Sequence, residues 1–106
     1  MKITIKTDVE TLFLLHKIVG QHGWYSFPKT IAERLKKSMI TEIFEILNKR
    51  CFAYSANPNG RKMSVSFRYH LASLLFDIIR ITELTFGIYE ANKLEIFKNE
   101  LHKKLL

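Results

Sequence analysis

The sequence predicts one mainly helical α+β domain with a small central antiparallel sheet and about four helices. Three observations lead to this prediction. The chain has 106 residues, which is the size of a single domain. It holds four glycines and two prolines, too few for a turn-rich all-β fold. A short stretch of alternating apolar and polar residues is followed by helical periodicity twice along the chain, which indicates the element order βααβαα.

The first strand is predicted at KITIK, residues 2–6, where the apolar residues of an alternating pattern share one face. A helix is expected to follow directly. Thr7 and Glu10 have the spacing of a capping box, which favours a helix that begins at Thr7. Apolar residues then cover most of the helix circumference, so we expect this helix to be buried and to end at Gly20.

The second helix is predicted to begin at another capping box, formed by Thr30 and Glu33. Apolar residues then recur at every fourth position, namely Ile31, Leu35, Met39, Ile43 and Leu47. One helix of about 20 residues would be about 30 Å long. Residues 51–61, which include the turn-forming stretch SANPNG, are expected to link the two halves of the chain.

The second half of the chain has the same kinds of element in the same order. The stretch KMSVSF at residues 62–67 alternates like the first strand. A second apolar helix is expected from about residue 68 to 82. A final amphipathic helix is expected to place one apolar stripe on the core, formed by Leu94, Phe97, Leu101 and Leu105.

These matches predict an internal repeat of a β-α-α unit, with one copy in residues 1–50 and the other in residues 62–106. A shift of 60 residues places Ile3 on Met63 and Ile5 on Val65. Two such units would be related by a pseudo-twofold axis, with their strands paired antiparallel at the centre. A two-stranded sheet leaves both outer edges open, so either helices cover these edges or another molecule pairs there. In the second case we expect a homodimer with a four-stranded sheet.

A second interpretation of the same region competes with the repeat. TIAERL, TEIFEILNKR and FAYSANPNGRKMSVSF, all within residues 30–67, resemble the first motif helix, the recognition helix and the wing of winged helix-turn-helix regulators. The resemblance implies phosphate contacts from Arg61 and Lys62. It also implies a surface that faces the DNA major groove, formed by Lys36, Lys37, Ser38, Thr41 and Glu45.

The segment LKKSMI departs from that family, because it is about two residues short of the usual turn and lacks the glycine that often breaks the helix there. The apolar four-residue spacing also continues through it. The two interpretations therefore differ on one structural point. The repeat requires a single helix from Ile31 to Leu47, whereas the winged helix requires a turn within it.

The net charge is +7, with 17 basic and 10 acidic residues, and the excess is present in both halves of the chain. Such a balance favours a polyanionic partner, DNA or RNA, because cationic surfaces attract phosphates at long range. Trp24 and Tyr25 lie in a predicted loop and are candidates for exposed aromatic contacts. The candidate nucleic-acid-binding residues are Lys36, Lys37, Lys49, Arg50, Arg61, Lys62 and Arg68.

Motifs for catalysis or metal binding are not found. The four histidines have no pair three or four residues apart, Cys51 is the only cysteine, and neither a phosphate-binding loop nor a nucleophile elbow is present. We therefore expect no catalytic residues, metal, cofactor or small-molecule substrate. The N-terminus does not have the pattern of a signal peptide, and the longest apolar stretch is too short to span a membrane, so a cytoplasmic protein without a membrane partner is expected.

From the sequence we expect a non-catalytic binding or assembly module, a small basic cytoplasmic protein that self-associates and contacts nucleic acid. Two alternatives remain open at this point. One is a winged helix-turn-helix DNA-binding regulator. The other is a protein–protein adaptor that has no nucleic-acid role.

Overall fold

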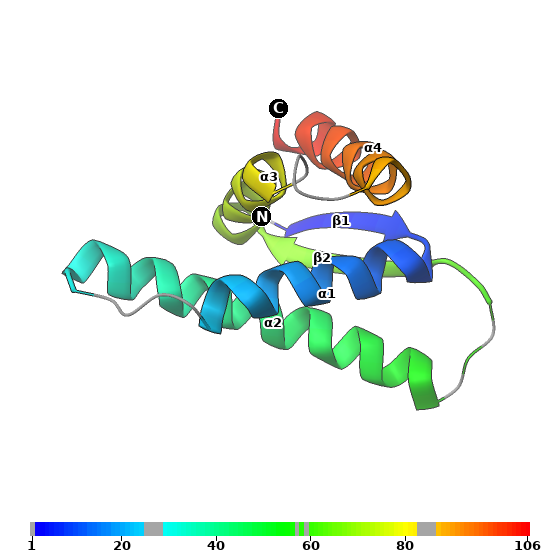
Figure 1. The fold of residues 1–106 in the computed structure, drawn as a ribbon, viewed down its shortest axis with the longest axis horizontal. Coiled ribbons are helices and arrows are strands. Elements are labelled where there is room, and N and C mark those ends of the chain that lie inside the picture. The colour runs from blue at the N-terminus through cyan, green and yellow to red at the C-terminus, as the bar shows by residue number, and fades with distance from the viewer. Residues whose placement is uncertain (1, 25–28, 57, 59, 83–86) are drawn as a thin grey trace.

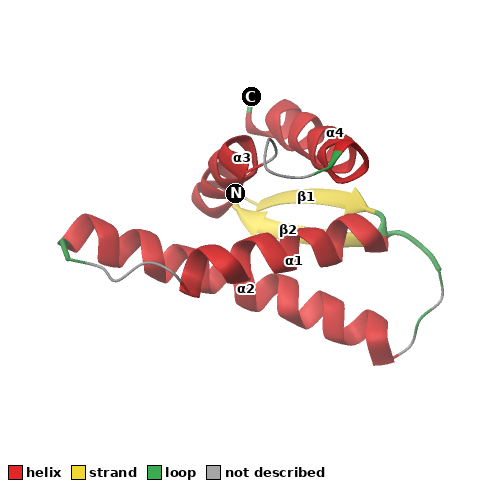
Figure 2. Cartoon of the chain, in the orientation of Figure 1, coloured by secondary structure: helices red, strands yellow, loops and turns green. Residues whose placement is uncertain are grey.

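The computed structural model describes residues 2–24, 29–56, 58, 60–82 and 87–106, and for residues 22–24 the backbone alone. The strands and helices follow in the order β1 (Lys2–Thr7), α1 (Val9–Trp24), α2 (Ile31–Ala56), β2 (Met63–Arg68), α3 (Tyr69–Thr82) and α4 (Ile88–Leu105). The predicted fold class, a mainly helical α+β domain with a small antiparallel sheet, is confirmed (Figure 2).

The two strands pair antiparallel at the centre of the molecule and form a ribbon. Ile3 lies opposite Phe67 and Ile5 opposite Val65, and all four side chains are buried. In Figure 1, α1 and α2 lie on one side of the strands and α3 and α4 on the other. Helix α4 contacts β1 and helix α2 contacts β2, so each strand has a helix beside it.

The burial of α1 and α3 follows one pattern at a separation of 60 residues. Leu12, Leu15, Ile18 and Val19 of α1 are buried, as are Ala72, Leu75, Ile78 and Ile79 of α3. In α2 and α4 the separation is 54, where Ile40, Ile43 and Leu47 correspond to Leu94, Phe97 and Leu101. The side chains of both halves form one continuous core.

The pairing of the strands is compatible with a pseudo-twofold axis. A twofold axis that relates residues 60 apart in sequence must pass between two strand residues that lie directly opposite each other and are themselves 60 apart. Ile5 and Val65 lie opposite each other and have this separation. This geometry and the recurring burial support the predicted repeat. An origin by duplication stays a prediction.

Helix α2 corrects the expectations drawn from the winged-helix resemblance. Residues Ile31 to Ala56 form a single helix, about 39 Å long. Tyr54 lies in this helix, and Val65 pairs with Ile5, so the described residues contain neither the turn nor the wing. The physical reason is that the apolar stripe of α2 continues without a change of phase, as the four-residue spacing indicated.

The prediction of a linker at residues 51–61 is wrong for the first half of that range. Residues 51–56 belong to α2. Cys51 lies one turn after Leu47 and is buried on the same face, which extends the packed part of the helix by another turn. Burial also raises the pKa of the Cys51 thiol.

The boundaries of α1 also differ from the prediction. Thr7 is the last residue of β1 and is buried, and the helix begins at Val9 after Asp8, whose Oδ1 accepts a hydrogen bond from the Thr11 hydroxyl at 2.5 Å. Gly20 does not end α1, which continues to Trp24. A Cβ atom at position 20 would lie 3.1 Å from Cε2 of the Phe44 ring, so glycine there permits close packing of α1 on α2.

The predicted capping box at the start of α2 is confirmed. The Glu33 N–H donates to Thr30 Oγ1 at 3.1 Å, and the Thr30 N–H donates to Glu33 Oε2 at 3.3 Å. Helix α2 thus begins where the sequence pattern places it. Its first eight residues, 31–38, include no buried side chain, so the helix extends beyond the core at that end (Figure 1).

Candidate nucleic-acid interface

The ribbon has one face that points away from the core. Because side chains alternate along a strand, Lys2, Thr4 and Lys6 of β1 share this face with Ser64, Ser66 and Arg68 of β2. We call these six residues the ribbon face. All are exposed except Ser66, which is half-buried. Since even the short Thr4 and Ser64 side chains are exposed, the face is open to solvent.

The charge of the ribbon face is entirely positive. Lys2 lies directly opposite Arg68, and Lys6 lies opposite Ser64. Within the described residues, no carboxylate forms an ion pair with Lys2, Lys6 or Arg68. Like charges at directly opposed positions of an antiparallel pair are destabilising, so this arrangement does not serve the stability of the isolated fold.

Two hydroxyl groups occupy the middle of the ribbon face. The Thr4 and Ser66 hydroxyls are hydrogen-bonded to each other at 2.8 Å. They separate the Lys2–Arg68 pair at one end from Lys6 at the other. Lys2 and Lys6 are four residues apart along an extended strand, which corresponds to about 13 Å. The face therefore has cations at its two ends and small polar groups between them.

Just beyond the ribbon, the surface carries both positive and negative charges. One position beyond the last paired residues of the two strands, Lys62 lies opposite Asp8. Both residues line a hollow of about 200 Å³, together with Glu10, Tyr54 and Arg61. Gly60, whose φ is +71°, lines the same hollow and donates its N–H to the Tyr54 hydroxyl at 3.2 Å. Carboxylates and cations are mixed here, so this hollow is less positive than the ribbon face.

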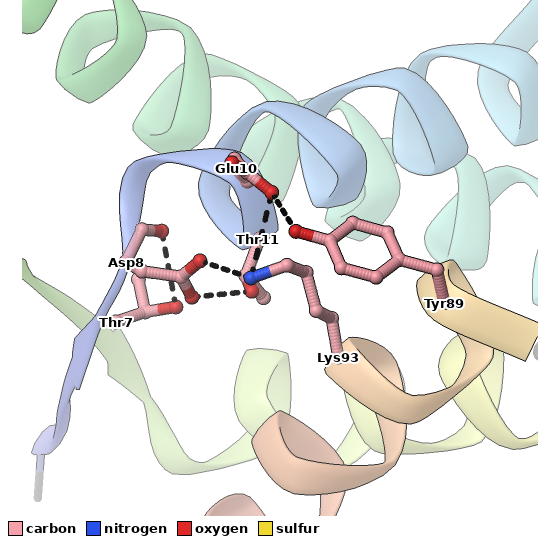
Figure 3. A network of polar contacts seen from close by, with 6 residues as sticks. All are labelled: Thr7, Asp8, Glu10, Thr11, Tyr89 and Lys93. Carbon is pink, nitrogen blue, oxygen red and sulfur yellow. Dashed lines mark hydrogen bonds and ion pairs between the residues drawn. The ribbon is translucent and has the colours of Figure 1, made fainter.

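A polar cluster joins α4 to the start of α1, as Figure 3 shows. Lys93 Nζ lies 2.7 Å from Asp8 Oδ2 and 3.5 Å from Glu10 Oε2. The Tyr89 hydroxyl donates to Glu10 Oε2 at 2.6 Å. The cluster holds the two helices together across the end of the sheet where β1 leads into α1.

The contacts within this cluster shift the pKa values of its residues. Burial raises the pKa of Asp8, but hydrogen bonds from Lys93 and Thr11 lower it by more, so the pKa lies below the ordinary value of 3.8. The hydrogen bond to Asp8 raises the pKa of Lys93, and donation to Glu10 raises that of Tyr89. Asp8 is thus ionised at neutral pH, whereas a general acid needs a raised pKa.

Replacing Asp8 by Asn is expected to lower the melting temperature near neutral pH by about 1–4 °C, a small change because both partners keep access to water. A carboxylate whose pKa is lowered by folding stabilises the protein above its ordinary value, 3.8, and this contribution is lost as the pH falls through the lowered pKa. The melting temperatures of the wild type and the Asp8→Asn variant, measured from pH 7 to pH 2, should therefore converge at the acidic end. A constant difference would contradict this assignment.

The basic residues singled out in the sequence fall in separate places. Arg68 belongs to the ribbon face, and Arg61 and Lys62 precede β2. Lys36, Lys37, Lys49 and Arg50 lie on α2, where positions 36 and 49 are about 20 Å apart along the helix. Of these four, Lys37 is half-buried and the others are exposed. Tyr25 and the side chain of Trp24 lie outside the described residues.

Lys2 and Lys6 were missed as candidates. Their signal was present, because the alternation of residues 2–6 that places isoleucines on the core also places both lysines on the opposite face. What the sequence alone did not show is which residues of the second strand share that face. Pairing with β2 brings Arg68 opposite Lys2 and makes the three cations one surface.

His16 is explained by packing. Its Nε2 lies 3.1 Å from Asn48 Oδ1, and its ring stacks on Phe44 with centroids 4.6 Å apart. Over the part of the chain that the structure describes, no three His, Cys, Asp or Glu side chains gather as a metal site would require. Over the same residues, no helix combines the length and the apolar character needed to cross a membrane.

A scan against protein-family models, a search of curated proteins and a search of solved structures each found no match for this chain.

Proposed function

We propose that the chain is a non-catalytic nucleic-acid-binding module and that the ribbon face is its contact surface. One observation carries the proposal. Lys2 and Arg68 lie directly opposite each other on an open face, with Lys6 at the far end and no described carboxylate paired to any of them. A row of phosphates would relieve the repulsion that the fold leaves in place.

Two further features support this proposal. The net charge of +7 attracts a polyanion from a distance, while the ribbon face supplies the local contacts. Thr4, Ser64 and Ser66 supply hydroxyl groups that bond phosphate oxygens or base edges, and their small size lets a ligand approach the backbone. A surface of Lys, Arg, Ser and Thr is typical of contacts to nucleic-acid backbones.

The test compares two triple variants that lose the same charge. Lys2→Gln, Lys6→Gln and Arg68→Gln remove the cations of the ribbon face, whereas Lys17→Gln, Lys36→Gln and Lys49→Gln remove three exposed lysines of α1 and α2. Both lower the net charge from +7 to +4. By fluorescence anisotropy at about 50 mM salt, the ribbon variant is expected to bind labelled nucleic acid at least about tenfold more weakly than the wild type.

The helix variant is expected to stay within about threefold of the wild type, since it loses only long-range attraction. Equal losses in the two variants would show that net charge alone determines binding. A larger loss in the helix variant would move the interface to α2. If the wild type binds no nucleic acid at this salt concentration, the protein–protein adaptor becomes the better account.

A single charge reversal is expected to raise stability and weaken binding at once. Lys2→Glu replaces a like-charged cross-strand pair with an opposite-charged one, which should raise the free energy of unfolding by about 0.2–1 kcal/mol. Urea denaturation measures this change, with Lys17→Glu as the control on an exposed part of α1. A variant that is no more stable than the wild type would mean that Lys2 and Arg68 do not repel each other.

Self-association is a second proposal, through a surface other than the expected strand edges. Helices α4 and α2 lie beside β1 and β2, which hinders pairing with another strand. Ile31 and Leu35, by contrast, are 86% and 62% exposed on one face of α2 beyond the core. If a dimer forms through them, light scattering should find Leu35→Glu monomeric at concentrations where the wild type is dimeric.

A further inference from the structure

We infer that the nucleic acid held by the ribbon face is B-form duplex DNA, entered through its major groove. This inference rests on the proposed function and adds the class of ligand. The side chains of the ribbon face argue against single strands, and its dimensions and layout distinguish DNA duplexes from RNA duplexes.

The dimensions of the ribbon face match the major groove. Two paired strands lie about 4.8 Å apart, so the ribbon is narrow in the direction across its strands. The major groove of B-form DNA is about 12 Å wide and admits a two-stranded ribbon. With both strands running along the groove, Lys2 and Lys6 of β1 face the phosphates of one wall and Arg68 of β2 faces those of the other.

The side chains of the ribbon face argue against single-stranded ligands. Proteins that hold single strands on a sheet stack the bases on aromatic side chains. The six outward positions are Lys, Thr, Lys, Ser, Ser and Arg, with no aromatic among them. Tyr69 follows Arg68 directly, but its hydroxyl donates to the carbonyl oxygen of Leu105, so its ring is held toward α4. An unstacked base therefore finds no platform here.

The shape of the ribbon argues against RNA duplexes. The major groove of an A-form helix is deep and narrow, and side chains on a ribbon do not reach its base edges. Its minor groove is wide and shallow, and it is usually recognised by contacts to the 2′-hydroxyl groups along the backbone. The ribbon face carries cations on both strands, and the B-form major groove is wide enough to place one strand toward the phosphates of each wall.

The centre of the ribbon face would lie over the base edges. Thr4 and Ser66 bond each other through one donor and one acceptor, which leaves one donor and further lone pairs for a ligand. Hydroxyl groups bond either donors or acceptors on the bases and so discriminate weakly. We therefore expect Thr4→Ala with Ser66→Ala to change affinity less than the loss of the three cations does, and to leave the salt dependence unchanged.

The test uses three probes of equal length and sequence, a DNA duplex, a DNA single strand and an RNA duplex, with the wild-type protein at about 50 mM salt. The DNA duplex is expected to bind about tenfold more tightly than the other two. Dimethyl sulfate then reports the groove, because it methylates guanine N7 in the major groove and adenine N3 in the minor groove. Protection of guanine N7 is expected, and the triple variant of the ribbon face should lose it.

Equal or tighter binding of the single strand or the RNA duplex would overturn the inference and leave the proposed function standing. Protection of adenine N3 with guanine N7 reactive would do the same, because it places the protein in the minor groove. Failure of all three probes to bind would overturn the proposed function itself. The two failures are therefore distinguishable in one set of measurements.

Discussion

Replacing Leu75 by alanine is expected to lower the free energy of unfolding by about 3–5 kcal/mol. Leu75 is fully buried in α3, and its side chain belongs to the core that both halves of the chain share. Truncation removes buried methyl groups and leaves a cavity that rigid neighbours fill only in part. Since a domain of this size is stabilised by about 5–15 kcal/mol in total, the loss is a large share of the stability.

The matched control is Leu35→Ala, the same substitution at a leucine of α2 that is 62% exposed. It should change the free energy of unfolding by no more than about 0.5 kcal/mol. Leu15→Ala, at the corresponding position of α1, is expected to cost about as much as Leu75→Ala. Urea denaturation measures all three variants. A cost at Leu35 equal to that at Leu75 would contradict the placement of the core.

Replacing Glu45 by proline is expected to cost about 3 kcal/mol or more. Glu45 is exposed in the interior of α2, between the buried residues Ile43 and Leu47. Proline there removes a helical hydrogen bond, and its ring clashes with the carbonyl of the preceding turn. The packed turns on both sides then no longer hold the same register against the core.

Glu45→Ala separates this backbone effect from the loss of the carboxylate. Because alanine keeps the N–H and favours a helix, this variant should be within about 0.5 kcal/mol of the wild type. Circular dichroism and urea denaturation report helix content and stability together. If proline and alanine at this position prove equally stable, α2 is not a continuous helix through residue 45.

Most of the fold could be predicted because its signals are local. Alternation at residues 2–6 marked the first strand, and the four-residue spacing from Ile31 marked the continuous helix α2. The errors lie at boundaries where packing decided against a local signal. Gly20 remains inside α1 because its missing side chain lets Phe44 approach, and α2 passes into the expected linker because Cys51 reaches the core.

The candidate site could be predicted only in part, because it depends on pairing between distant segments. Net charge pointed to a polyanion, and Arg68 was among the candidates. Lys2 and Lys6 gain significance only once β1 pairs with β2, more than 50 residues away in sequence. A pattern within one strand shows which residues share its face, whereas the partner strand and its register follow from the tertiary structure.

The measurement closest to the central claim is the change in backbone amide NMR signals as a DNA duplex is added at about 50 mM salt. If the ribbon face is the interface, the largest shifts occur at the amides of residues 2–6 and 64–68, with small shifts along residues 31–38 of α2. Shifts confined to α2, with the amides of both strands unchanged, would contradict the account.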